Sequence, residues 1–130
     1  MPDKEIVINT GPMIALIAAT GNLNILKTGL LVDQPITLSP ILKNVLDAGE
    51  ASVIQYALDN QIGTVCIDEV AGRRIARLHD LNVTGSLGVL LKAKSEGFDI
   101  SIRHCINNMR KNGIYLSSEL VSKAILIAGE

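Results

Sequence analysis

The sequence predicts an α/β fold in which helices cover both faces of a parallel sheet. Short β-branched segments alternate along the chain with segments of helical pattern. Several helical segments begin at a capping residue or end at a glycine, which are helix boundary signals. Such alternation implies right-handed crossovers between parallel strands. The 130 residues, 48% of them hydrophobic, suit a single domain with a buried core.

The first forty residues predict one strand, two helices and one weak extended stretch. The strand is Glu5–Asn9, and Pro12 suits the first turn of the helix that follows and ends at Gly21. The other two segments are a short helix, Asn22–Thr28, and an extended stretch, Leu30–Leu38, which Pro35 interrupts.

Two helices with clear start signals precede the second strand. Ser39 and Pro40 begin a short helix that runs to Leu46. Asp47 and Glu50 have the spacing of a capping box with Asp at the cap, which predicts a helix to about Asn60. The strand itself is the compact apolar segment Thr64–Ile67.

The second half continues the alternation. An amphipathic helix follows Asp68 directly, and a short strand leads into a helix that Gly97 ends. A polar helix, a brief extended piece and a final apolar helix complete the chain. These predicted segments are Asp68–His79, Leu81–Thr84, Ser86–Glu96, residues 99–112, Ile114–Leu116 and Ser118–Ala128.

Composition excludes several classes of function. The three aromatic residues are too few to stack the successive bases of a single-stranded nucleic acid. The chain has no GxxxxGK[ST], GxGxxG, HExxH or GxSxG motif, so the common nucleotide-binding, zinc-protease and serine-hydrolase classes are excluded. The longest apolar run, Met13–Ala19, is far shorter than a membrane span, and the N-terminus lacks a signal peptide. We expect a cytoplasmic protein without a membrane partner.

The cysteines and histidines lack the spacing of metal ligands. Cys66 and Cys105 have no CxxC partner, so we expect buried or bystander thiols and no disulfide or zinc site. His79 and His104 are expected to have structural or solvent-facing roles.

Charge is divided unevenly along the chain. Residues 1–72 hold eight acidic and three basic residues, whereas residues 73–130 hold five acidic and nine basic residues. The acidic half could form a surface that binds a metal and faces a basic, phosphate-binding surface from the other half. Alternatively, the uneven distribution of charge could be that of an ordinary solvated surface.

The polar residues that follow the predicted strands are the candidate functional residues, because ligands of open parallel sheets bind beyond the carboxyl ends of the strands. Asn9, Asp68 and Glu69 follow two strands, and Glu50 lies in the first turn of its helix. Oxygen ligands of this kind hold a hard divalent cation. A second group of residues is suited to bind phosphate, because it contains an arginine side chain and two hydroxyl groups near the start of a helix. Its members are Arg73, Thr84 and Ser86.

Each candidate also has an ordinary structural interpretation. Glu50 fits a capping box, and Asp68 fits the N-cap of the next helix. Glu69 could be a residue whose charge complements the helix dipole. Ser86 could be an ordinary helix cap, and Arg73 could form an internal ion pair.

The segment Val7–Leu16 resembles the opening motif of PIN domains, in which an Asp stands at the position of Asn9. Two later segments are similar to the acidic motifs of a PIN-like subgroup of short prokaryotic proteins of unassigned function. They are Leu46–Ala51 and Ile67–Glu69, the latter followed by Gly72, Arg73 and Ala76. Val83–Leu91 and Ser117–Glu130 match that subgroup as well, so the resemblance covers most of residues 4–130.

The resemblance implies a three-layer α/β/α sandwich with a parallel sheet over a single PIN-like domain, residues 1–130. It also implies a ribonuclease dependent on Mg²⁺ or Mn²⁺, of the kind found as the toxin of toxin–antitoxin pairs. Glu50 and Asp68 match acidic positions of the family and are the expected catalytic residues. Asn9, Glu50, Asp68 and Glu69 are the expected metal ligands.

The resemblance also implies that the middle section of the family is missing between about residues 29 and 40. With Asn9 in place of Asp, two of four expected acids are absent, and we expect the metal to bind weakly or not at all. One hypothesis is a ribonuclease with impaired or lost catalysis, with RNA and a small antitoxin protein as partners. The alternative is a non-catalytic, dimeric binding protein on the same fold. In either case we expect a homodimer, because missing helices would uncover apolar surface. A remoter option is an anion-binding domain that uses Thr84, Gly85 and Ser86.

Overall fold

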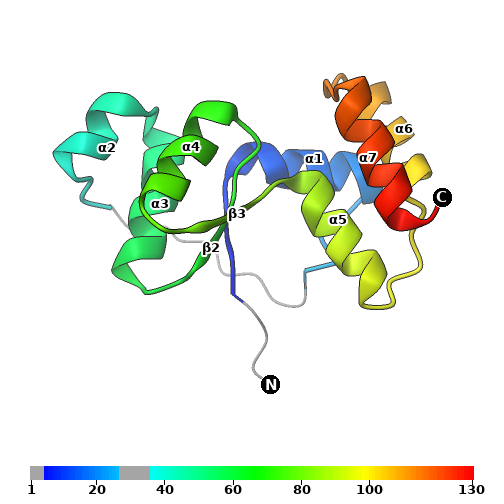
Figure 1. Ribbon diagram of the computed structural model, residues 1–130, viewed down its shortest axis with the longest axis horizontal. Coiled ribbons are helices and arrows are strands. Elements are labelled where there is room, and N and C mark those ends of the chain that lie inside the picture. Colours follow the sequence, from blue (N-terminus) through cyan, green and yellow to red (C-terminus); the bar gives the residue numbers. More distant parts are fainter. Residues whose placement is uncertain (1–4, 27–35) are drawn as a thin grey trace. The chain divides into compact units, whose positions relative to one another are not determined.

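A computed structural model describes residues 5–26 and 36–130 of the chain (Figure 1). The described residues belong to two compact units. The first contains those within residues 1–12 and 30–85, and the second those within residues 13–29 and 86–130. Each unit is described by itself.

The first unit is built on a parallel sheet with the strand order β1-β2-β3. The strands are β1 (Val7–Ile8), β2 (Thr64–Cys66) and β3 (Asn82–Thr84). Ile8 pairs with Cys66, and Cys66 pairs with Thr84, so the three carboxyl ends meet at one edge. This confirms the predicted α/β class with a parallel sheet, and it is consistent with a PIN-like α/β/α fold.

Among the described residues, the first unit contains the whole of α2 (Pro40–Val45), α3 (Ala48–Asp59) and α4 (Val70–Leu78). Helix α3 packs against β1 and β2, and α4 packs against β3. Their apolar faces bury a core with the strands, which includes Leu42, Ile54, Val65, Ile67 and Ala76. The predicted starts of α2 and α3 are confirmed, because the side chains of Ser39 and Asp47 accept backbone hydrogen bonds at those helix ends.

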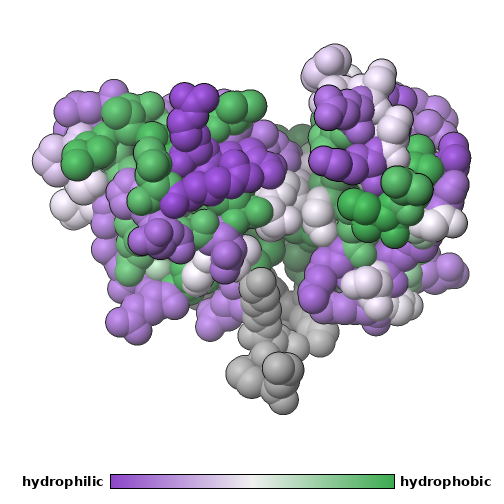
Figure 2. Space-filling model, in the orientation of Figure 1, coloured by the Kyte–Doolittle hydropathy of each residue, from purple (hydrophilic) through white to green (hydrophobic). Residues whose placement is uncertain are grey.

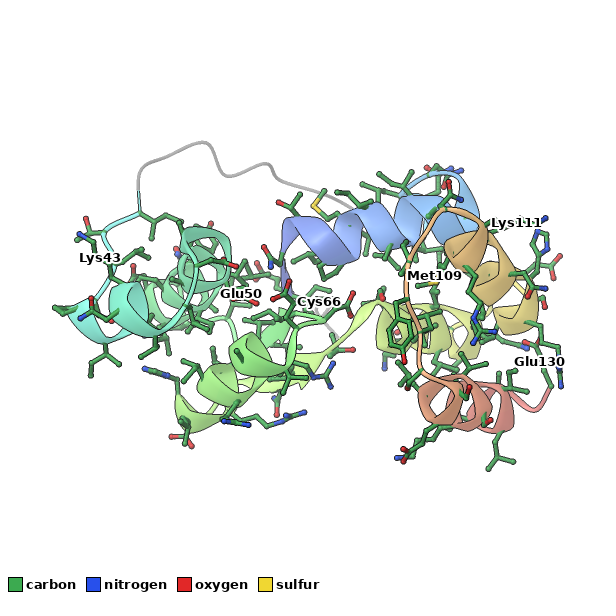
Figure 3. All side chains as sticks on the ribbon, turned by 90° about the horizontal axis from the view of Figure 1, so that it is seen from above. Lys43, Glu50, Cys66, Met109, Lys111 and Glu130 are labelled. Atoms are coloured by element: carbon green, nitrogen blue, oxygen red, sulfur yellow. The ribbon has the colours of Figure 1, made fainter. Side chains whose placement is uncertain are left out.

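The second unit is helical. Helix α1 (Thr10–Thr20) enters it from the first unit and is followed by α5 (Ser86–Ser95), α6 (Ile102–Lys111) and α7 (Ser118–Ala128). Its core contains Leu16, Leu90, Ile106 and Met109, and Figure 3 shows Met109 among these helices. The chain leaves α7 through Gly129 at φ +72°, a left-handed conformation that glycine adopts without a steric penalty.

The side chain of Glu130 ties three helices of the second unit together. Its carboxylate accepts hydrogen bonds from the backbone N–H groups of Ile102 and Arg103, at 2.7 and 3.2 Å, and from the hydroxyl of Ser101 at 2.9 Å. The ammonium group of Lys94 on α5 donates to it as well. The hydrogen bonds from Lys94 and then Ile102 lower the pKa of Glu130 to about 2. An anion at the N-terminus of α6 is favoured by the unpaired N–H groups there.

Three predicted segments differ from the structure. The described part of the predicted helix Asn22–Thr28 is a turn in which Asn22 Oδ1 accepts from Asn24 N at 2.9 Å, a local bond that competes with helix formation. Residues 36–38, the described end of the predicted extended stretch, form no strand. The polar helix begins at Ile102 and not at residue 99, because the hydroxyl of Ser101 caps it by accepting from His104 N. The remainder of the first two segments, residues 27–35, lies outside the described residues.

Both cysteines are free and buried, as predicted. Burial is the main cause that raises the pKa of Cys66 to about 12, so its thiol stays protonated at neutral pH. None of the helices in the described ranges is both long and apolar enough to cross a membrane.

Candidate metal centre

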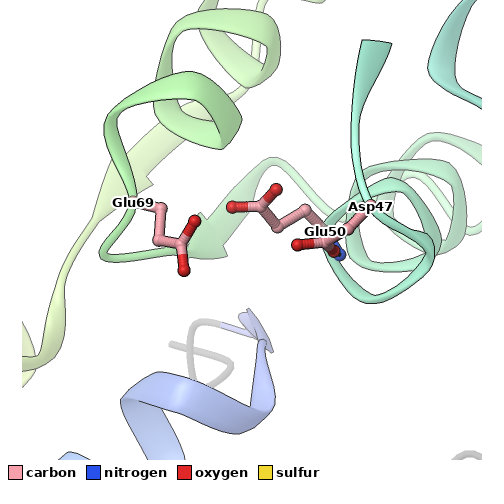
Figure 4. A group of neighbouring side chains, drawn as sticks. All are labelled: Asp47, Glu50 and Glu69. Atoms are coloured by element: carbon pink, nitrogen blue, oxygen red, sulfur yellow. The ribbon is translucent and has the colours of Figure 1, made fainter. Parts of the chain in front are cut away.

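Three carboxylates of the first unit converge at the carboxyl edge of the sheet. Asp47, Glu50 and Glu69 each place a carboxylate oxygen within 4.8 Å of the others (Figure 4). Glu50 comes from the first turn of α3, and Glu69 directly precedes α4. Figure 4 shows the Glu50 and Glu69 carboxylates facing one another. Oxygen donors at this spacing can surround a divalent cation.

Glu50 is the buried member of this acidic cluster. Its side chain lies inside the unit (Figure 3), and the residue is only 4% exposed. Its Oε1 has no hydrogen-bond partner among the described residues. Burial, followed by the negative charges of Asp47 and Glu69, raises the pKa of Glu50 to about 7. A buried, unpartnered carboxylate oxygen is costly without a compensating charge, and a cation would supply that charge.

Asp47 has a structural role and remains suited to a cation. Its Oδ1 accepts a hydrogen bond from Glu50 N at 2.9 Å, which is the cap half of the predicted capping box. A carboxylate has two oxygens and about four lone-pair sites, so a cap and a cation can be served together. Sequence reasoning assigned Asp47 only to the cap. The capping box accounted for the three-residue spacing to Glu50, although the same spacing also brings both side chains to one helix end.

Asn9 lies at the border of the acidic cluster. Its Oδ1 accepts a hydrogen bond from Thr10 N at 3.0 Å. Asn9 Oδ1 and Asp47 Oδ1 both approach Gly49, since a Cβ built on Gly49 would lie 3.5 and 3.4 Å from them. The amide oxygen is therefore near the cluster but brings no charge.

Asp68 is exposed and is not one of the three clustered residues. Its Oδ1 and the Nη1 of Arg73 both lie against Gly85, where a Cβ would be 2.7 and 2.9 Å from them. Arg73 Nη1 also donates to the carbonyl oxygen of Ile67 at 3.3 Å. The interpretation of Asp68 as the N-cap of α4 is wrong, because the helix begins one residue later. Glu69 occupies the cap position and makes no side-chain cap bond.

The three residues predicted to bind phosphate occupy different settings. Arg73 and Thr84 are half-buried residues of the first unit, and Thr84 Oγ1 donates to the carbonyl oxygen of Gly85 at 3.4 Å. Ser86 is buried and is the first residue of α5, in the second unit, so the position before this helix belongs to Gly85. A phosphate role for these residues stays a prediction.

The first unit is thus a parallel α/β sheet with an acidic cluster at the carboxyl ends of its strands. A family model described as DUF3368, a PIN domain, matches residues 31–130. The chain therefore belongs to this PIN domain family. No curated protein and no solved structure matches the chain. The family is nuclease-like, and PIN domains generally bind a divalent metal.

Proposed function

We propose that this PIN domain holds one Mg²⁺ or Mn²⁺ ion at Asp47, Glu50 and Glu69 and hydrolyses phosphodiester bonds of RNA at a low rate. The observation that carries this proposal is the Oε1 atom of Glu50. It is buried and unpartnered, and it belongs to a carboxyl group that faces another carboxylate. Without a cation, the buried carboxyl group of Glu50 lies beside two exposed carboxylates of like charge.

The chain's own residues would divide the work of hydrolysis. Glu50, once deprotonated, is the central ligand, and Asp47 and Glu69 complete the charged set. The bound cation supplies activation of water and stabilisation of charge on the phosphate. Asp68 remains a proposed catalytic and metal-binding residue, because it is adjacent to Glu69 in the chain. Arg73, Thr84 and Ser86 are the proposed contacts to the phosphate.

We infer weak catalysis for two reasons. Asn9 stands where the family has an Asp, so one charge is missing beside the cluster, and fewer charged ligands lower cation affinity. We also propose that residues 1–130 form one PIN-like domain whose middle section is shortened between about residues 29 and 40. The proposed partners are RNA and a small antitoxin protein, and the proposed location is the cytoplasm.

Charge-removing variants that keep the fold test the enzymatic proposal. Asp47→Asn keeps an oxygen that caps α3, and Glu69→Gln removes no cap bond, so both should fold normally. With a structured RNA, the wild-type protein is expected to cleave slowly and only with Mn²⁺ or Mg²⁺. Each variant should reduce the cleavage rate at least roughly tenfold, because it removes one charged ligand of the cation. Asp68→Asn, assayed alongside, tests the proposed role of Asp68.

Lack of cleavage by the wild-type protein with any divalent cation would overturn the ribonuclease proposal. Equal cleavage rates in the wild type, Asp47→Asn and Glu69→Gln would overturn the assignment of the site.

The alternative is a non-catalytic, homodimeric binding protein, and exposed apolar side chains favour it. On the first unit, Ile41 and Val45 share a face of α2, and Val70 and Leu78 are exposed on α4. Figure 2 shows hydrophobic surface over α2 and beside the charged side chains of α4. Apolar surface of this kind is commonly covered by a partner.

We expect a dimer mass from light scattering of the purified protein at micromolar concentration. The apolar surface supplies the physical reason, because its burial between two copies is favourable. A charge introduced on this surface, Ile41→Glu, should shift the mass toward the monomer, with exposed Glu119→Gln as the control. A monomer mass for the wild-type protein would contradict the dimer.

A further inference from the structure

Gly72 occupies a helical position where alanine would ordinarily be preferred. It is the third residue of α4 and is buried. Glycine inside a helix costs about 1 kcal/mol relative to alanine. Its φ is not in the left-handed region, so backbone conformation does not require a glycine there. The reason must therefore be found in the surrounding atoms.

The atoms nearest to Gly72 belong to Glu50 of the acidic cluster and to Ile67, which follows β2. A Cβ built on Gly72 would lie 3.0 Å from Glu50 Oε1, 3.2 Å from Glu50 Cδ and 2.9 Å from Ile67 Cγ2. Carbon and oxygen atoms at these separations overlap, so at least one neighbour would have to move. The carboxyl group of Glu50 thus lies in the space that the missing side chain of Gly72 leaves open.

We propose that Gly72 is a positioning residue for the metal centre: its bare Cα lets the Glu50 carboxyl group pass beneath α4 and face Glu69. The inference rests on the proposed function for its functional meaning, because positioning matters only if the carboxyl group holds a cation. A methyl group at residue 72 would push the Glu50 carboxyl group out of the arrangement in Figure 4.

Titration of Mn²⁺ by calorimetry tests the effect on the site. Gly72→Ala is expected to weaken Mn²⁺ binding at least roughly tenfold, because one ligand no longer faces the other two. The matched control is Gly11→Ala, also a helical position, where a Cβ would have no heavy atom within 4 Å. Equal affinities in wild type and Gly72→Ala would overturn the inference. Absence of Mn²⁺ binding in the wild-type protein would overturn the proposed function instead.

A double-mutant cycle on thermal unfolding tests the contact without any metal. Gly72→Ala should lower Tm in the wild-type background. In the Glu50→Ala background, the loss should shrink by at least half, because the carboxyl group that the methyl meets is gone. The same loss in both backgrounds would assign the effect to Ile67 alone and overturn the positioning role.

If Gly72→Ala fails to fold, folding of the double variant and of Glu50→Ala still tests the contact between residue 72 and Glu50. Folding of the double variant would support the contact with Glu50, and failure of the double variant to fold, while Glu50→Ala folds, would overturn it.

Discussion

Replacement of Glu50 by Gln is expected to abolish Mn²⁺ binding and to stabilise the metal-free protein at alkaline pH. The carboxyl group of Glu50 has its pKa raised from 4.5 to about 7 in the folded state. The folded state therefore binds a proton more tightly than the unfolded state, and stability is lost as pH rises from about 4.5 through 7. At 1.36 kcal/mol for each pKa unit, the wild-type protein loses about 3 kcal/mol over this interval.

The neutral amide of Gln cannot lose a proton, so this pH dependence should disappear in Glu50→Gln. Urea unfolding of both proteins at several values between about pH 4 and pH 8 measures the difference. We expect the unfolding free energy of Glu50→Gln to rise relative to wild type as pH increases. Glu119→Gln, which makes the same chemical change at an exposed residue, is the control.

With Mn²⁺ present, the unfolding free energy of the wild-type protein should increase with pH instead of decreasing, because a cation binds the deprotonated carboxylate. A difference between wild type and Glu50→Gln that stays constant from about pH 4 to pH 8 would contradict the assigned environment of Glu50.

Replacement of Asn9 by Asp is expected to strengthen cation binding. The oxygen of Asn9 borders Gly49 together with Asp47 Oδ1, so an Asp there would add a negative charge next to the cluster. Because cation affinity follows the number of charged ligands, we expect Mn²⁺ to bind roughly tenfold more tightly. The RNA cleavage rate should rise with it.

Titration calorimetry of Asn9→Asp and of a matched control checks this expectation. Asn82→Asp makes the same chemical change at an exposed residue at the start of β3, the opposite end of the parallel strands. It should leave Mn²⁺ affinity unchanged. Unchanged affinity in Asn9→Asp as well would mean that residue 9 takes no part in the site.

Local signals in the sequence predicted most of the elements because those signals act over a few residues. Ser39 and Asp47 cap the helices that they were expected to begin. The β-branched segments became neighbouring parallel strands, which is the backbone conformation that β-branched residues favour. The turn at Asn22 was not predicted, because its side chain can satisfy backbone groups either inside or outside a helix.

The hydrophobic periodicity of the sequence does not tell which carboxylates form the acidic cluster. A start of α4 at Val70 puts Glu69, and not Asp68, at the helix boundary. A shift of one residue changes the direction of a side chain, so the choice between these two carboxylates depends on tertiary packing. Asp47 was hidden for a different reason: a capping role explained it fully.

The central claim is that Asp47, Glu50 and Glu69 hold a divalent cation together. A crystal structure of the protein grown with Mn²⁺, with anomalous data collected at the manganese absorption edge, tests it most directly. We expect one anomalous peak within about 2.0–2.6 Å of an oxygen from each of the three carboxylates, the range for oxygen ligands of hard cations. Absence of a peak there, or a peak held by Asp68 without Glu50, would contradict it.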